Sequence, residues 1–299
     1  MTELAIGFVG IGNMGWPMAA NLVGAGFDVT VCDTGPDRAA SFAADVGGRA
    51  ATRAADAAAD ADVVITMLPT SSHVADVVRD ITPSLATGQV VVDMSSGTPS
   101  VTRRLAEDLA PIGVALVDCP VSGGVPRAVT ADLSIMAGGG AAVLDRVQPI
   151  LDALGSSVHR CGGVGAGQAM KALNNLMSAA GLLIGVEALL IGQQSGLDPE
   201  RMIEMLNASS GANNSTQRKL GPYVLTRAFD SGFGLDLMVK DLGIALQMGS
   251  DAGLTTPLAT ACAEVWANAA ELLGRGHDHT EIARYSEAVS GVELAAREA

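Results

Sequence analysis

The sequence is 299 residues long, about twice the usual size of one domain, and it therefore predicts two domains. Hydrophobic residues make up 48% of the chain and charged residues 17%, which is enough apolar material for a packed core and excludes a disordered protein. The net charge of -14 repels phosphate backbones and anionic lipid, so we expect neither nucleic acid nor a membrane surface as a partner.

The first half of the chain alternates two hydrophobic periods. Short β-branched runs predict buried parallel strands at 5–9, 29–32, 63–67, 90–93 and 114–117. Between them, Ala-rich segments have helical spacing at 17–25, 37–44, 72–80 and 100–109, and the stretch 50–61 suits a helix or a connection. Two further runs, 133–137 and 157–161, flank a helical segment at 141–154 and complete the sheet. This order predicts an α/β fold, a Rossmann-type doubly wound parallel sheet.

After Gly167 the strand signals end and only helical patterns follow. They predict one long apolar helix over 168–195 and further helices at 199–208, 237–252 and 257–273. The linkers between them are rich in Gly, Asn and Ser, most clearly over 209–216. We therefore expect a dinucleotide-binding domain at 1–164 and an all-α domain at 165–299, joined by a long interdomain helix that begins beside the glycine cluster 162–167.

The cysteine spacing and the first residues of the chain indicate in which cellular compartment the protein lies. Four widely separated cysteines lack CxxC spacing: Cys32, Cys119, Cys161 and Cys262. This pattern indicates reduced thiols in a cytoplasmic protein. The first residues lack the basic start of a signal peptide. The apolar stretch 176–191 contains Glu187, so it predicts a buried helix of a soluble protein and not a membrane span.

A glycine-rich motif, Gly10-Ile11-Gly12-Asn13-Met14-Gly15, follows the first predicted strand and opens a helix. In such motifs the first glycine permits a tight turn, the second lets the backbone approach a pyrophosphate, and the third allows close helix–strand packing. The N–H groups and the positive dipole end of the helix attract the phosphates. A glycine turn without a ligand is the alternative, but the position in a βαβ unit favours a dinucleotide site.

Asp33 stands at the end of the second predicted strand, where a carboxylate accepts hydrogen bonds from the adenosine ribose. Its charge repels a ribose phosphate, and the next residue is Thr34 instead of an arginine that clamps that phosphate. Arg38 lies a turn into the next helix, where a solvated side chain is favoured over a phosphate contact. The sequence therefore predicts NAD in preference to NADP.

Four segments in this order resemble the β-hydroxyacid dehydrogenase family, which includes 3-hydroxyisobutyrate dehydrogenases and tartronate semialdehyde reductases and is related to 6-phosphogluconate dehydrogenase. They are GFVGIGNMGWPMA at 7–19, DCPVSGG at 118–124, GAGQAMKALNN at 165–175 and LMVKDL at 237–242. Together they extend over most of the chain, which makes a chance match a poor explanation.

The resemblance implies that Lys171 is the general acid/base that exchanges a proton with the substrate hydroxyl. Burial of this lysine would lower its pKa toward the value that a base needs. The alternative is a surface lysine with its charged end in water. Asn175, four residues on, lies on the same helical face and is implied to hold the substrate. Ser122, Gly123 and Gly124 are implied to bind the substrate carboxylate, although the same string alone is only a turn.

The resemblance also implies a set of further cofactor contacts: Leu68, Pro69, His73, Ser96 and Lys240. His73 stands where the family often has asparagine, and Ser96 stands where threonine is usual. The residue after Lys240, Asp241, is expected to orient its neighbours and not to react.

Several positions leave alternatives open. Arg127 either selects a second anionic group on the substrate or pairs with Asp132, and the pair or a solvated side chain is favoured. Two histidines, His277 and His279, lack a third placed ligand, so we expect a solvated loop and no metal site. Substrate selectivity is expected from Arg127 and from three side chains of the helical domain: Asn213, Phe233 and Asp236.

Taken together, the sequence predicts an NAD-dependent dehydrogenase for a small β-hydroxy acid, such as 3-hydroxyisobutyrate, or its semialdehyde. Chemistry is expected in a cleft between the two domains, at the carboxyl edge of the sheet. The apolar interdomain helix predicts a homodimer or homotetramer. The alternatives are an imine reductase on the same scaffold, whose members usually replace the lysine, and a non-catalytic dinucleotide-binding regulatory protein. The particular hydroxy acid and the physiological direction stay open.

Overall fold

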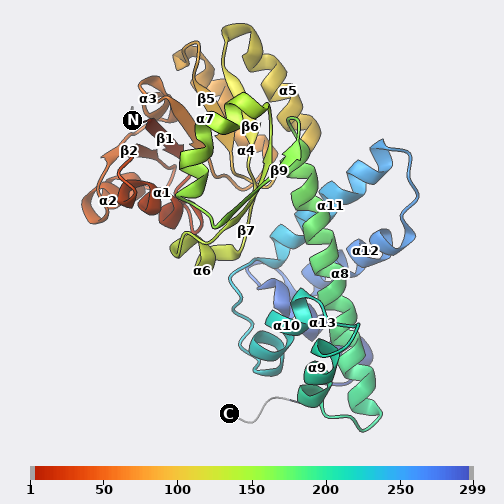
Figure 1. Cartoon of the computed structure of the whole chain (residues 1–299). Coiled ribbons are helices and arrows are strands. Elements are labelled where there is room, and N and C mark those ends of the chain that lie inside the picture. Colours follow the sequence, from red (N-terminus) through yellow and green to blue (C-terminus); the bar gives the residue numbers. More distant parts are fainter. Residues whose placement is uncertain (1–3, 296–299) are drawn as a thin grey trace. The chain divides into compact units, whose positions relative to one another are not determined.

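The computed structural model describes residues 4–295 (Figure 1). By the proximity of its Cα atoms the chain divides into two compact units, Met1–Lys171 and Ala172–Ala299. The division falls within the long helix α8 (Ala166–Gln194), so the first turn of this helix belongs to the sheet unit. The domain boundary between residues 164 and 165 stays a prediction.

The first unit is built on one sheet in the order β3-β2-β1-β4-β5-β6-β8-β7, with β9 beside β8. The strands are β1 (Ala5–Val9), β2 (Asp28–Cys32), β3 (Arg49–Ala50), β4 (Val63–Thr66), β5 (Val90–Asp93), β6 (Ala115–Asp118), β7 (Val121–Ser122), β8 (Ser134–Gly138) and β9 (Ser157–Gly162). The six strands from β3 to β6 are parallel and follow the Rossmann order, so the predicted fold class is confirmed.

The far edge of the sheet departs from the prediction of an entirely parallel sheet. β8 runs antiparallel to both β6 and β7, and only β9 is parallel to it. The reason is local: β7 pairs antiparallel with β8, which follows after one short helix, and this pairing sets the direction of β8. The two strands that the sequence did not predict, β3 and β7, have two residues each, too few to show a period of two.

Alternating side chains of the strands pack against helices on both faces. Val63 and Ile65 belong to one core cluster, and Val64 between them belongs to another. The first cluster includes side chains of α1 (Gly15–Gly24), α2 (Arg38–Asp45) and α7 (Ala141–Asp152). The second includes side chains of α3 (Ala54–Ala59), α4 (Ser71–Ile81) and α5 (Pro99–Leu109). Because both faces are covered, the central strands β1 and β4 to β6 are almost entirely buried and mostly apolar, whereas β3 and β9 at the edges are exposed and polar.

The second unit is helical, with a core around the fully buried Trp266. It continues α8 with α9 (Pro199–Asn207), α10 (Asn214–Arg218), α11 (Leu235–Asp251), α12 (Pro257–Leu273) and α13 (Ile282–Ser290), and a π-helical turn spans Leu220–Leu225. By length and composition α8 could cross a membrane. This is weak evidence, because half of its most apolar 18-residue window is buried and core helices pass the same test.

The segment around His279 is buried, so the expectation of a solvated loop is wrong. The Asp278 carboxylate accepts hydrogen bonds from the Ser231 hydroxyl and from the backbone N–H of Gly232 and Thr280, while the His279 ring stacks on Trp266. These donors compensate the loss of water around the carboxylate. Within residues 4–295 no group of three or more His, Cys, Asp or Glu side chains is arranged to hold a metal.

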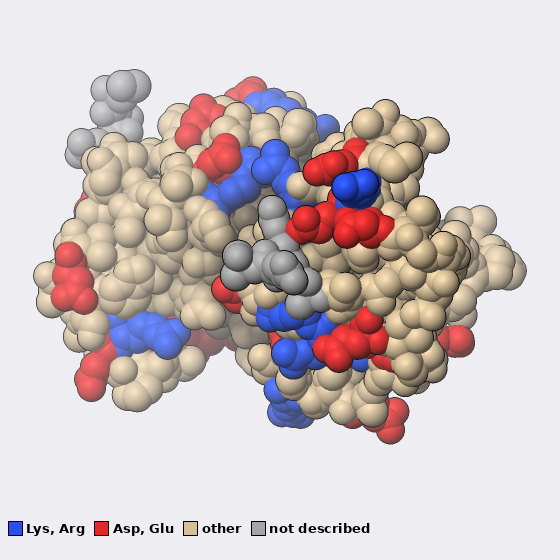
Figure 2. Space-filling view, turned by 90° about the horizontal axis from the view of Figure 1, so that it is seen from below, with Lys and Arg blue, Asp and Glu red and all other residues tan. Residues whose placement is uncertain are grey.

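On the face shown in Figure 2, lysine and arginine side chains lie among aspartates and glutamates and do not gather into one basic field. All four cysteines are free thiols.

Candidate active site

The glycine turn between β1 and α1 is shaped by contacts that exclude side chains at two of its positions. Gly10 has φ +95°, and a Cβ there would lie 2.4 Å from the Met67 carbonyl oxygen. A Cβ on Gly15 would lie 2.0 Å from the Gly10 carbonyl oxygen. At Gly12, by contrast, the nearest atom to a Cβ would be Arg38 Nη1 at 3.9 Å. The turn is therefore closely packed at Gly10 and Gly15 and open at Gly12, as a pyrophosphate-binding turn requires.

Asp33 follows β2 and holds this turn in place. Its Oδ2 accepts a hydrogen bond from Ile11 N at 2.9 Å, and its Oδ1 accepts one from Gly35 N at 2.7 Å. Each oxygen keeps a second lone pair for a ribose hydroxyl. Arg38 is exposed as predicted, but its Nε would lie 3.4 Å from a Cβ on Gly35, so the guanidinium lies beside the same turn.

The predicted cofactor residues after β4 and β5 lie on two loops joined by a hydrogen bond. Leu68 N donates to the Ser95 hydroxyl at 2.9 Å, which links the Leu68–Pro69 segment to the loop that contains Ser96. His73 lies in the first turn of α4, where its Nδ1 is 2.6 Å from the Thr70 hydroxyl at the helix cap. The ring is therefore engaged with its own helix terminus.

The segment expected to bind the substrate carboxylate combines a strand end, a turn and a helix start. Ser122 ends β7, Gly123 has φ +135°, and Gly124, with φ +68°, begins α6 (Gly124–Val129). The Nδ2 of Asn21 on α1 donates to the Ala128 carbonyl oxygen at 2.7 Å, which fixes α6 against the helix that follows the glycine turn.

Arg127 lies on α6, and its Nε is 2.9 Å from Asp132 Oδ2. This contact agrees with the favoured alternative of an ion pair. Both side chains are more than two-fifths exposed, so the pair contributes little to stability.

Lys171 lies on α8 and only 7% of its surface is exposed, so the alternative of a surface lysine is wrong. The start of this helix is bound to the ends of β5 and β6. The Asp118 carboxylate accepts hydrogen bonds from Gly165 N at 2.6 Å and Gln168 N at 2.8 Å. The Gln168 side chain donates to Asp93 Oδ2 at 3.2 Å.

Asp93 and Asp118 are register partners at the ends of adjacent strands, and both are buried. Burial raises the pKa of Asp93 to about 6, against the opposing effect of hydrogen bonds from Ser95 and Thr66. Burial also raises the pKa of Asp118. The sequence predicted no role for Asp93 or Gln168. The signal that could have found this site is that each of two adjacent, otherwise apolar strands ends in an aspartate.

In the helical unit, Asp241 brings two predicted site residues together. Its buried carboxylate accepts a hydrogen bond from Asn175 Nδ2 and lies 3.3 Å from Lys240 Nζ. Asn174 Nδ2 donates to Asn175 Oδ1 at 3.1 Å, which orients the same amide. Asp241 therefore has the orienting arrangement expected of it.

The three side chains proposed for selectivity differ in how they are used. Asn213 caps α10 through hydrogen bonds from Ser215 N and Thr216 N. The Phe233 ring makes an edge contact with His279 at a centroid distance of 5.5 Å. Asp236 is exposed in the first turn of α11.

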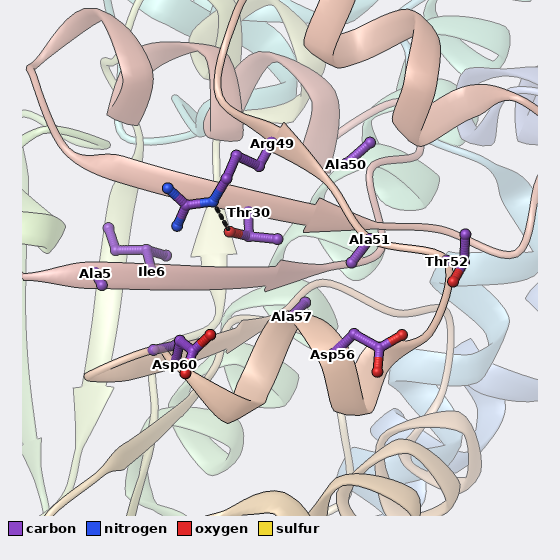
Figure 3. A pocket seen from close by; sticks show the side chains of 11 residues that line it. Ala5, Ile6, Thr30, Arg49, Ala50, Ala51, Thr52, Asp56, Ala57 and Asp60 are labelled. Atoms are coloured by element: carbon purple, nitrogen blue, oxygen red, sulfur yellow. Dashed lines mark hydrogen bonds between the residues drawn. The ribbon is translucent and has the colours of Figure 1, made fainter.

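A cavity of about 330 Å³ lies elsewhere in the sheet unit, between α3 and the strands β1 to β3 (Figure 3). Its lining includes Ala5 and Ile6, which begin β1, whereas the glycine turn follows the end of that strand. Arg49 at its rim already binds Asp28 at 2.7 Å and Thr30 at 3.2 Å. This cavity is therefore separate from the site that the motifs define.

The strand order, the glycine turn beside its switch point and the carboxylate after the second strand define the class of a dinucleotide-dependent oxidoreductase. Comparison with known families agrees. Residues 5–163 match the NAD binding domain of 6-phosphogluconate dehydrogenase, and residues 165–286 match the NAD-binding of NADP-dependent 3-hydroxyisobutyrate dehydrogenase.

Individual relatives extend over almost the whole chain. A 2-(hydroxymethyl)glutarate dehydrogenase of Eubacterium barkeri is 34% identical over 98% of both chains. A 3-hydroxyisobutyrate dehydrogenase of Pseudomonas aeruginosa is 36% identical over 86% of this chain and 89% of its own. The solved 3-hydroxyisobutyrate dehydrogenase of Mycobacterium tuberculosis with L-serine has a TM-score of 0.88 at 33% identity, covering 95% of this chain and 99% of its own.

The chain belongs to the β-hydroxyacid dehydrogenase family. The resemblance inferred from the four motifs is thereby confirmed, as is the binding of NAD(P). The residues around Asp33 determine whether NAD or NADP is preferred.

Proposed function

We propose that this enzyme transfers a hydride between NAD and a small β-hydroxy acid of the 3-hydroxyisobutyrate type, or its semialdehyde, with Lys171 as general acid/base. The observation that carries the proposal is the burial of Lys171 on a helix whose first turn is bound to the carboxyl ends of β5 and β6. Ligands of doubly wound sheets bind at these strand ends. The names of its relatives support the substrate class.

The bound nicotinamide would supply the hydride acceptor when the hydroxy acid is oxidised. Lys171 would accept the proton of the substrate hydroxyl through Nζ, and would return it in the reverse direction. Backbone N–H groups of Gly123 and Gly124 and the hydroxyl of Ser122 would bind the substrate carboxylate. Asn175, held by Asp241, would orient the reacting oxygen.

Asp33 supports NAD as the preferred cofactor, because a carboxylate beside a ribose phosphate is repulsive. Arg38 acts in the opposite sense, since its guanidinium lies beside Gly12 and Gly35. We expect the carboxylate to dominate because it is anchored by two backbone hydrogen bonds, whereas Arg38 is exposed.

The test of the activity is a turnover screen with NAD at alkaline pH, read as the absorbance of reduced nicotinamide. The panel is 3-hydroxyisobutyrate, glycerate, serine and short hydroxyalkanoates. Turnover of at least one acid supports the proposal. NAD binding without turnover of any of them would favour the regulatory protein, and turnover of cyclic imines alone would favour an imine reductase.

We further infer that a second copy of the chain covers an exposed apolar face of α8. Met170, Met177, Ile184 and Ile191 recur at intervals of seven residues, and each is at least 43% exposed. A seven-residue apolar repeat is the pattern of a helix that packs lengthwise on another helix. The free thiols support the cytoplasmic location that we propose with it.

A further inference from the structure

Gln168 occupies a position in α8 that the activity does not explain. Its side chain is 1% exposed and makes three hydrogen bonds. Oε1 accepts from Gly97 N at 2.7 Å, and Nε2 donates to the Ser95 carbonyl oxygen at 2.8 Å and to Asp93 Oδ2 at 3.2 Å. We propose that Gln168 is a positioning residue that fixes the location of Lys171 by joining the first turn of α8 to the loop after β5.

The backbone of the same turn is held by a second anchor. Asp118 accepts hydrogen bonds from Gly165 N and Gln168 N, so a buried carboxylate lies at the positive end of a 29-residue helix. A Cβ on Gly167 would lie 2.2 Å from the Met136 carbonyl oxygen and 2.9 Å from Asp118 Oδ2. The helix therefore starts in direct contact with strand backbone, and no flexible side chain separates the two.

The two anchors act on the lysine through the helix itself. Gln168 and Lys171 are three residues apart, and residues at this spacing are neighbours on one helical face. Ser95, which Gln168 contacts, also accepts the hydrogen bond from Leu68 N. One hydrogen-bonded frame thus includes both loops expected at the cofactor and the turn that precedes Lys171.

Such a frame affects the rate because proton transfer needs a fixed donor–acceptor distance. A displacement of about 1 Å at a reacting group reduces a rate by about a hundredfold. The inference rests on the proposed role of Lys171, so the experiment includes a Lys171→Ala variant that tests this role separately.

The test compares Gln168→Met with Gln89→Met. Gln89 is a matched control because it is also buried and makes three hydrogen bonds, to Ala58, Ala61 and Ala86, at the opposite end of β5. Both variants should lower the melting temperature to a similar degree. Only Gln168→Met should lower kcat, by about ten- to a hundredfold, with a smaller change in the Kd of NAD. The deuterium isotope effect on its kcat should rise, because hydride transfer becomes slower relative to product release.

The outcomes separate the two claims. A folded Gln168→Met enzyme with wild-type kcat and isotope effect overturns the inference if Lys171→Ala is inactive. An equal loss of kcat in Gln89→Met also overturns it, since a general packing defect would then explain both. Full activity of Lys171→Ala would instead contradict the proposed function.

If Gln168→Met does not fold, Gln168→Glu provides the same test. It keeps an acceptor for Gly97 N but brings a second carboxylate against Asp93. Protonation of either carboxyl removes that repulsion, so the activity of the variant relative to wild type should rise several-fold on acidification from pH 8 to pH 6. A constant ratio across this range would overturn the inference.

Discussion

Asp33 accepts a hydrogen bond from the backbone N–H of Ile11, so the carboxylate expected at the cofactor ribose also closes the glycine turn. Its other oxygen is bonded to Gly35 N. One side chain therefore sets both the shape of the turn and the sign of the charge beside it. A substitution at Asp33 should change affinity as well as cofactor choice.

For the wild-type enzyme we expect a higher kcat/KM with NAD than with NADP. Asp33→Ser should narrow this gap by removing the repulsion of the ribose phosphate, and should also lower kcat/KM with NAD because the turn loses its anchors. The measurement is kcat/KM with both cofactors at one hydroxy-acid concentration. Equal or better use of NADP by the wild type would contradict the role of Asp33.

Arg38 supplies the matched control for that experiment. In the Asp33→Ser background, Arg38→Ala should reduce kcat/KM with NADP several-fold and leave NAD nearly unchanged, because only the former brings a phosphate to the guanidinium. The same loss with both cofactors would mean that Arg38 acts on the turn and not on the phosphate.

Lys171→Ala should reduce kcat by about a hundredfold or more, the scale of losing a general acid/base. The affinity for NAD should change little, because the glycine turn lies on another element of the chain. The melting curve should stay cooperative, which shows that the loss is chemical. Near-normal turnover by a folded variant that binds NAD would remove Lys171 from the mechanism.

His279 should make stability depend on pH. Burial lowers its pKa against the opposing effect of Asp278, and Lys219 acts in the same direction as burial. The folded chain therefore favours the neutral ring, whereas the unfolded chain binds a proton near pH 6.5. The contribution of the neutral His279 ring to the free energy of unfolding is complete above that pH. It falls as the pH decreases, by at most about 1.4 kcal/mol per pH unit.

The measurement is the free energy of unfolding from urea titrations at pH 7.5 and 5.5, for wild type and His279→Phe. Phenylalanine keeps the aromatic contacts with Trp266 and Phe233 but does not titrate. The difference between the unfolding free energies at the two pH values should be smaller in the variant than in the wild type. In the wild type Asp278 titrates below this window, because hydrogen bonds from His279 and Thr280 outweigh the effect of burial and hold its pKa well below the usual range. An unchanged difference would show that His279 is not the titrating group.

We expect the exposed apolar face of α8, formed by Met170, Met177, Ile184 and Ile191, to be the contact between subunits. Ile184→Glu, which places a charge at a side chain that is 59% exposed, should shift the mass measured by light scattering toward the monomer. Val129→Glu on α6 is an equally exposed control and should not. A wild-type protein that is monomeric at micromolar concentration would contradict the inference.

The sheet was predictable because its strands are buried on both faces and read as continuous β-branched runs bounded by helical periods. The direction of β8 could not be predicted. A hydrophobic run does not show whether a strand will be parallel or antiparallel to its neighbours, and β7, the strand that sets the direction of β8, has only two residues. The tight turn at Gly10 and Gly15 was predictable from spacing alone, because a side chain at either position would clash with backbone atoms, whereas the contact of Asp33 with Ile11 N was not.

The buried polar partners escaped prediction for a different reason. Gln168 hydrogen-bonds to Asp118 and Asp93 across sequence separations of 50 and 75 residues, and no local pattern encodes such pairing. The burial of His279 was not predicted because a run of polar residues suggests exposure to solvent. Two of the donors that satisfy the Asp278 carboxylate, Ser231 and Gly232, come from a segment more than 40 residues away. Satisfied polar groups in a core are visible only once the elements are assembled.

The capping of α8 by Asp118 also sets an order of events during folding. The N–H groups of Gly165 and Gln168 have their protein partner on β6, 47 and 50 residues away, so while the helix forms alone only water satisfies them. We therefore expect the first turn of α8 to fray in the unfolded ensemble and to become stable when the end of β6 is in place. In a pulse-labelling experiment, these two amide protons would become protected together with the central strands, later than amides in the middle of the helix.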